Sequence, residues 1–148
     1  ALVFAHFPLD AARQAITGHS MGGHGALTLA LTFPERFRSV SAFAPICHPT
    51  RSDWGRKQFA AYLGADEGPW AAHDAVELIA ARGLTLPLLV DQGGADKFLD
   101  LLQPQALEAA LAGTDAVFRW QAGYDHSYFF VASFMQDHIA FHARALLA

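Results

Sequence analysis

Four short apolar segments, separated by stretches with helical spacing, limit the folds open to this chain more than any other feature. The segments span residues 14–18, 39–46, 86–90 and 116–120, lengths typical of buried strands. The predicted helices span residues 26–33, 71–82, 99–111 and 128–147, and Gly113 is expected to cap the third. Strands that alternate with helices predict an α/β fold: a mostly parallel sheet with helices on both faces and ligands bound beyond the carboxyl ends of the strands.

The composition is that of a globular domain. The chain has 148 residues, of which 53% are hydrophobic, so we expect one domain over residues 1–148. Ten basic residues against 14 acidic ones give a net charge of -4, and the absence of a basic cluster argues against nucleic acid as a partner. No apolar run reaches the roughly 20 residues of a membrane span. Cys47, the only cysteine, cannot form an internal disulfide, which favours the cytoplasm.

The first residues resemble the end of a helix rather than a targeting segment. Residues 1–7 are mostly apolar and stop at Pro8, which disfavours helical geometry in the residue before it. They carry neither a basic leader nor a small-residue cleavage site. We therefore expect the chain to be truncated at its amino terminus.

The segment Gly18-His19-Ser20-Met21-Gly22 matches the Gly-x-Ser-x-Gly nucleophile elbow and lies between a predicted strand and a predicted helix. In this sharp turn the serine takes a strained conformation that exposes its hydroxyl, and the two glycines avoid collisions with strand and helix. The helix N-terminus favours the negative charge that develops during acyl transfer. The alternative is a glycine-rich turn whose serine only caps the helix.

A serine hydroxyl needs a base to become a nucleophile, and the base needs a carboxylate that fixes its tautomer. The chain order in such folds is serine, acid, histidine. His126 lies between the last predicted strand and the last predicted helix, where this order places the base. We therefore predict His126 as the base of Ser20.

Three aspartates are candidates for the acid. Asp96 lies on the loop after the third predicted strand, whereas Asp91 ends that strand and is expected to bond to neighbouring backbone. Asp125 is adjacent to His126, and an adjacent side chain rarely points at its neighbour's ring, so it is expected to stabilise the turn. Asp96 is our choice.

Other residue groups allow a second interpretation. His138 and His142 stand four apart on a predicted helix and could share a metal ion, but no further ligand is evident, so a structural role is favoured. Trp54, Trp70 and Trp120 are expected in core or cap packing, and Cys47 as a small buried residue. The long segment 47–83 is rich in aromatic residues and is expected to form a cap or wall beside the site.

Four ordered motifs carry a family resemblance. They are GHSMGGHGAL at 18–27, SAFAPIC at 41–47, DQG at 91–93 with DKFL at 96–99, and GYDHSY at 123–128. From about residue 7 to its end, the chain resembles the S-formylglutathione hydrolase family, also called esterase D. The resemblance implies an α/β-hydrolase fold and a cytosolic thioesterase that cleaves S-formylglutathione to formate and glutathione in formaldehyde detoxification.

The resemblance also assigns roles. It implies Ser20 as nucleophile, Asp96 as acid and His126 as base, with the backbone N–H of Met21 as one oxyanion-hole donor. It implies a small-molecule substrate and neither metal nor cofactor, and it leaves a homodimer open. The family's amino-terminal half, with the early strands and the second oxyanion donor, has no counterpart here. Losing one such donor costs about a hundred- to a thousandfold in rate, and losing strands bares a sheet edge. His48 stands where the family usually has Asn.

The hypothesis is therefore a serine thioesterase acting on S-formylglutathione. One rival is a general carboxylesterase or acyltransferase on the same scaffold, because a triad fixes the chemistry but not the acyl or leaving group. Another is an inactive truncated fragment or a binding module that kept the architecture.

Overall fold

The sheet has four strands, and all of them run parallel. The computed structural model describes residues 2–148. Within this range the strands are β1 (Ala15–His19), β2 (Ser39–Phe43), β3 (Leu88–Gly93) and β4 (Val117–Gln121), paired in chain order. Their carboxyl ends therefore share one edge of the sheet. The mostly parallel α/β arrangement predicted from the sequence is confirmed.

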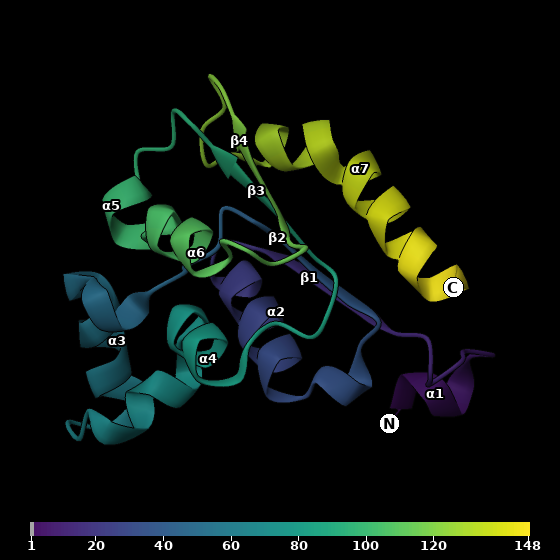
Figure 1. Cartoon of the computed structure of the whole chain (residues 1–148), viewed down its shortest axis with the longest axis horizontal. Coiled ribbons are helices and arrows are strands. Elements are labelled where there is room, and N and C mark those ends of the chain that lie inside the picture. Colours follow the sequence, from purple (N-terminus) through teal and green to yellow (C-terminus); the bar gives the residue numbers. More distant parts are fainter. Residues whose placement is uncertain (1) are drawn as a thin grey trace.

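Helices cover both faces of this sheet (Figure 1). On one side lie α2 (Met21–Thr32), α4 (Ala75–Arg82) and α6 (Pro104–Ala110), and on the other lies α7 (Tyr128–Leu147). The other helices are α1 (Leu2–His6), α3 (Asp53–Leu63) and α5 (Leu99–Leu102), with short 3-10 segments at Pro34–Arg36, Pro49–Arg51 and Gly68–His73. α7 has the predicted bounds. α1 ends before Pro8 as expected, while Ala1 lies outside the described residues.

The face of the sheet toward α2 carries the main apolar core. Val40 and Ala42 of β2 and Leu88 and Val90 of β3 pack together with Leu27 of α2, and all five are almost completely buried. Full burial of a valine or leucine side chain is worth about 1.5–3 kcal/mol, so this cluster stabilises the packing of α2 against the sheet.

The opposite face, toward α7, combines a smaller apolar cluster, in which Phe43 of β2 packs against Phe130 of α7, with buried polar groups. His142 contacts the Ser39 hydroxyl through Nδ1 and the Ser41 hydroxyl through Nε2, both at 2.7 Å. One turn earlier, His138 Nε2 lies 3.0 Å from the buried carboxylate of Asp91. The two histidines of the predicted helix thus contact different strand side chains and hold α7 on the sheet, which supports a structural role for both.

The predicted helix over 99–111 is wrong, because the structure contains two helices there. α5 and α6 are separated by Gln103, whose φ of 57° is left-handed. Pro104 follows it, and the proline ring disfavours helical geometry in the preceding residue. Gly113 is not the C-cap, since α6 already ends at Ala110; it lies in the next turn with φ of +81°.

Other observed element boundaries also differ from the predicted ones. The strand predicted over 39–46 ends at Phe43, because Ala44 leaves the extended region with φ of 40°. The strand predicted over 86–90 starts two residues later and runs to Gly93, so it includes Asp91. α2 begins at Met21, five residues before the predicted start, since its glycines do not interrupt the first turn.

The long segment 47–83 folds into α3, α4 and two 3-10 segments. α4 starts at Ala75 rather than at 71, because the Asp74 carboxylate caps it by accepting from the N–H groups of Val76 and Glu77. Trp70 is buried against Phe59, as expected for a packing residue.

Candidate active site

Ser20 occupies the sharp turn between β1 and α2. Its backbone has φ of 57° and ψ of -117°, outside the regions that most side chains adopt. Its N–H donates to the Phe43 carbonyl at 2.9 Å, and its own carbonyl accepts from the N–H of His24 at 2.9 Å. Neighbouring strand and helix therefore hold Ser20 in the strained conformation predicted for the elbow.

The two glycines of the motif differ in what they permit. A Cβ on Gly18 would lie 2.2 Å from the carbonyl oxygen of Gly22, so only glycine fits there. A Cβ on Gly22 would meet no atom within 4 Å in the part of the chain that the structure describes. Among residues 2–148 the predicted steric need thus applies to Gly18 and not to Gly22.

Three side chains predicted from chain order meet at the carboxyl edge of the sheet. His126 Nε2 lies 2.8 Å from Ser20 Oγ, and His126 Nδ1 lies 2.6 Å from Asp96 Oδ2. They follow β1, β3 and β4, whose carboxyl ends lie at the same edge of the sheet. A carboxylate only accepts, so Nδ1 carries the hydrogen and Nε2 is left to accept the serine proton.

The Asp96 carboxylate is buried and fully engaged. Oδ1 accepts from the N–H of Phe98 at 2.8 Å, and Oδ2 accepts from Gln92 Nε2 at 3.1 Å as well as from His126. Only 4% of Asp96 is exposed. These bonds fix the orientation of the carboxylate and, through it, of the imidazole ring.

Asp91, the second candidate acid, does not bond to His126 within residues 2–148 and has its own hydrogen-bond partners. It was expected to bond to backbone, but Arg119, Gln121 and His138 all bond to its carboxylate through their side chains. Burial would raise the pKa of Asp91, but the hydrogen bonds from His138, Arg119 and Gln121 outweigh it and lower the pKa to about 2. Asp91 is thus an ionised part of the contact between the sheet and α7 at neutral pH.

Asp125 stabilises its own turn, as expected. Its Oδ1 accepts from the backbone N–H of Ser127 at 3.0 Å, and hydrogen bonds from Ser127 lower its pKa. Of the three candidate acids, only Asp96 contacts His126 through a side-chain hydrogen bond among residues 2–148.

His19 contacts His126 and was not singled out from the sequence. The two ring centroids are 4.6 Å apart, and the Tyr128 ring also packs against His19 with centroids 5.6 Å apart. Burial lowers the pKa of His19, and the neighbouring His126 lowers it further, so a neutral ring packs against the imidazole. Its position beside Ser20 in the sequence was the only available signal.

An apolar pocket of about 160 Å³ opens beside the serine. Met21 and Ile46 line it on the elbow side, and Trp54, Phe59 and Tyr62 of α3 form the opposite wall. The aromatic segment 47–83 therefore contributes a wall next to the site, as predicted. Met21 is also the first residue of α2, so its N–H has no partner within the helix.

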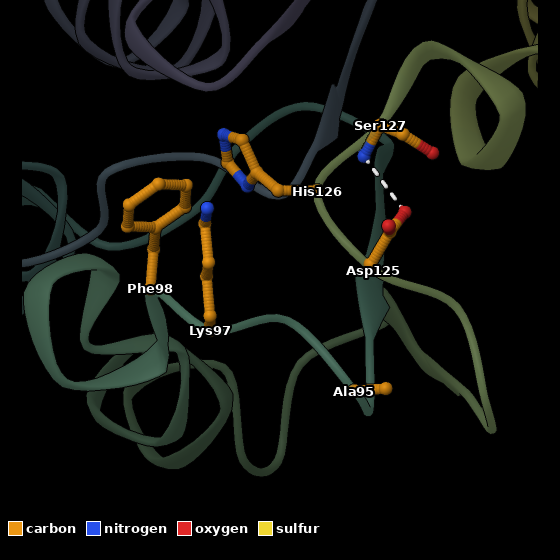
Figure 2. A pocket seen from close by; sticks show the side chains of 6 residues that line it. All are labelled: Ala95, Lys97, Phe98, Asp125, His126 and Ser127. Carbon is orange, nitrogen blue, oxygen red and sulfur yellow. Dashed lines mark hydrogen bonds between the residues drawn. The ribbon is translucent and has the colours of Figure 1, made fainter.

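A second and more polar pocket borders His126 (Figure 2). Its volume is about 430 Å³, and Lys97, Phe98, Asp125 and Ser127 line it together with His126. Sequence patterns do not predict this pocket, because it forms where the loops after β3 and β4 meet.

Cys47 and His48 lie behind the site. Cys47 is completely buried, and burial raises the pKa of its thiol well above 9.0. This matches the small buried residue predicted from the sequence. His48 Nδ1 lies 2.9 Å from Asp74 Oδ2, so the position where the resembled family usually has Asn contributes here to the hydrogen bonding around the α4 cap.

The parallel sheet and the elbow between β1 and α2 define an α/β-hydrolase. Residues 1–141 match the family model described as "Putative esterase", and the chain belongs to this esterase family. No helix within residues 2–148 is long and apolar enough to cross a membrane.

The chain is also similar to proteins named S-formylglutathione hydrolase. It is 63% identical over 147 residues to the one from Paracoccus denitrificans, covering 98% of this chain and 53% of that protein. For the one from Mus musculus the identity is 51% over 152 residues, with 99% and 54% covered. The solved structure of an S-formylglutathione hydrolase from Agrobacterium tumefaciens superimposes with a TM-score of 0.92 at 48% identity, over 98% of this chain and 53% of the other. The chain spans about half the length of these relatives.

Proposed function

We propose that this chain is part of a single α/β-hydrolase domain that hydrolyses S-formylglutathione to formate and glutathione in formaldehyde detoxification. The observation that carries the proposal is the continuous hydrogen-bonded line from Ser20 through His126 to Asp96. Similarity to S-formylglutathione hydrolases over 98% of the chain supports the choice of substrate.

In this mechanism Ser20 Oγ attacks the formyl carbonyl while His126 Nε2 takes the hydroxyl proton. Asp96 keeps the ring in the reactive tautomer and stabilises the imidazolium that forms. The negative charge on the carbonyl oxygen is held by the N–H of Met21 at the start of α2, where the helix dipole adds to the effect.

The tetrahedral intermediate then collapses, and the C–S bond breaks. His126 returns its proton to the sulfur, so glutathione leaves as the thiol and Ser20 is formylated. Water, deprotonated by the same imidazole, attacks the formyl ester, and formate leaves as Ser20 regains its proton. No cofactor takes part in either half of the cycle.

Replacing Ser20 with Ala in protein expressed from the complete coding sequence tests this mechanism. We expect kcat for S-formylglutathione to fall by about 10⁴-fold or more, because the hydroxyl is the attacking group. Ser133→Ala is the matched control: this exposed serine on α7 bonds only to the Phe129 carbonyl, and its loss should leave the rate unchanged. A fluorophosphonate probe should label the parent and not Ser20→Ala; strong activity in Ser20→Ala would refute the proposal.

A second candidate is a carboxylesterase with broader acyl specificity. The apolar pocket beside Met21 favours it, because the wall of Trp54 and Tyr62 could hold an acyl chain longer than formyl. Comparing kcat/KM for S-formylglutathione with that for aryl esters of increasing acyl length separates the two. A higher kcat/KM for the longer esters would favour the esterase.

We place the protein in the cytoplasm, in agreement with a single cysteine that is buried and reduced. We also propose that the protein forms a homodimer. Light scattering of the purified protein would measure its molar mass in solution and test this.

A further inference from the structure

The pocket bordered by Lys97, Phe98, Asp125 and Ser127 also borders His126, the proposed base (Figure 2). In acyl transfer the base that deprotonates the serine later hands the proton to the leaving atom. The leaving atom is therefore adjacent to His126, and the rest of the leaving group extends into space that borders this residue. At about 430 Å³ the pocket falls within the usual range of small-ligand sites, roughly 300–1,000 Å³.

Lys97 brings a positive charge to this pocket. The chain has two lysines, Lys57 and Lys97, and no arginine is among the residues that line the pocket. Among residues 2–148, no ion pair involves Lys97. A cation without a protein carboxylate partner is able to pair with a carboxylate of a bound ligand.

Phe98 places the ammonium group on the side of the base. Lys97 Nζ lies 5.0 Å from the centroid of the Phe98 ring, and that ring meets His126 edge-on with centroids 5.1 Å apart. Figure 2 shows the Lys97 side chain running beside Phe98 toward His126. The attraction between a cation and an aromatic face limits how far the ammonium group moves from the pocket.

The carboxylate of Asp125, which also lines the pocket, does not face Lys97. The Asp125 carboxylate accepts from the Ser127 N–H, and Figure 2 shows it turned toward Ser127 and away from Lys97. The net charge of the chain is -4, which repels an anionic substrate at long range. Lys97 beside His126 places a positive charge in the pocket.

We infer that this pocket is the subsite for the leaving thiol and that Lys97 pairs there with a carboxylate of that thiol. The inference rests on the proposed thioesterase function and adds the residue that recognises the carboxylate of the leaving thiol. Lys97 does not touch the reacting atoms, so it affects binding of the anionic thioester and leaves neutral esters unaffected.

The test compares one acyl group on charged and neutral thiols. kcat/KM is measured for S-formylglutathione and for its diethyl ester, in which both carboxylates are masked, with the parent protein and with Lys97→Ala. Partly exposed ion pairs contribute little, so we expect a fall of about two- to fivefold for the acid and no change for the diester. Lys97→Glu should produce a larger fall for the acid alone, and salt at about 1 M should remove most of the difference.

Lys57→Ala is the matched control, because Lys57 is exposed on α3 and lines neither pocket beside the site. It should leave both values unchanged. An unchanged acid-to-diester ratio in Lys97→Ala, or equal falls for the two substrates, would overturn the thiol subsite while leaving the proposed function standing. If the parent protein cleaved neither thioester but still hydrolysed a neutral aryl ester, the proposed function would fail and the subsite with it.

Discussion

At the scale of single residues, the site depends on the strained backbone of Ser20 and on the hydrogen-bonded carboxylate of Asp96. A non-glycine residue in the conformation of Ser20 costs of order 1–3 kcal/mol, which neighbouring bonds to Phe43 and His24 help to offset. The Asp96 carboxylate is held in one orientation, because each of its oxygens accepts at least one hydrogen bond. In the proposed mechanism the strain exposes the serine hydroxyl, and the carboxylate orients the ring that activates it.

Asp96→Asn should therefore inactivate the enzyme without unfolding it. In one orientation the new NH₂ group faces His126 and Gln92, and in the other it faces the N–H of Phe98. A donor meets a donor either way, and in the first orientation the histidine tautomer that accepts the serine proton is lost as well. We expect kcat to fall by about 10³- to 10⁴-fold with an unchanged far-UV circular dichroism spectrum.

Asp115→Asn serves as the control for this substitution, because Asp115 is exposed and distant in sequence from the triad. It should keep the parent kcat. Full activity in Asp96→Asn would show that another group orients His126.

At the scale of elements, the packing of β1 against α2 sets the geometry of the elbow. Gly18 at the end of β1 lies so close to Gly22 that no side chain fits between strand and helix. Farther along α2, Gly25 is in ordinary helical backbone, and a Cβ there would meet nothing within 4 Å in the described chain. The same substitution at these two positions should therefore have opposite effects.

Gly18→Ala should destabilise the protein, because a Cβ 2.2 Å from the Gly22 carbonyl oxygen forces β1 and α2 apart. We expect a loss of roughly 2 kcal/mol or more in the free energy of unfolding, together with a loss of activity as Ser20 moves. Gly25→Ala should instead stabilise α2 by about 0.5–1 kcal/mol. Urea titrations of both variants measure this, and equal stability of the two would contradict the steric argument.

Local sequence patterns predicted the elements well where the signal was strong. The glycines and the apolar strand located the elbow, and the long periodic stretch predicted α7 with its observed bounds. Prediction failed where one residue outweighed the periodicity, as Pro104 did in splitting α5 from α6. The positions of Ser20, Asp96 and His126 followed from chain order in a parallel sheet, while their roles stay predictions. The Lys97 pocket depends on how two loops meet, which no local pattern encodes.

At the scale of the whole molecule, the face of the sheet toward α7 is distinguished by buried ionisable groups that add to its apolar packing. Apolar packing stabilises both α2 and α7, but α7 also contacts the sheet through His138 on Asp91 and through His142 on two serines of β2. The sequence indicated a buried β2 but not these polar contacts, because the partners are about a hundred residues apart along the chain. The stability of this face should depend on pH.

His142 determines the direction of that dependence. Burial, and secondarily the neighbouring His138, lowers the pKa of His142 from 6.5 to about 4. Between these values the unfolded chain binds a proton that the folded protein does not, so folding free energy is lost as the pH falls from about 6.5 toward 4. Asp91, with its pKa lowered to about 2, adds a further loss only below about pH 4.

We therefore expect the parent protein to lose about 1 kcal/mol of stability through His142 between pH 7 and pH 5, a value reduced from the full shift because the ring is only partly buried. His142→Gln removes the titrating group, so its free energy of unfolding should fall less over the same interval, as measured by urea titration at each pH. His6→Gln alters an exposed histidine on α1 and should keep the parent slope. If His142→Gln lost as much stability as the parent, His142 would not be the group that couples the contact between α7 and the sheet to pH.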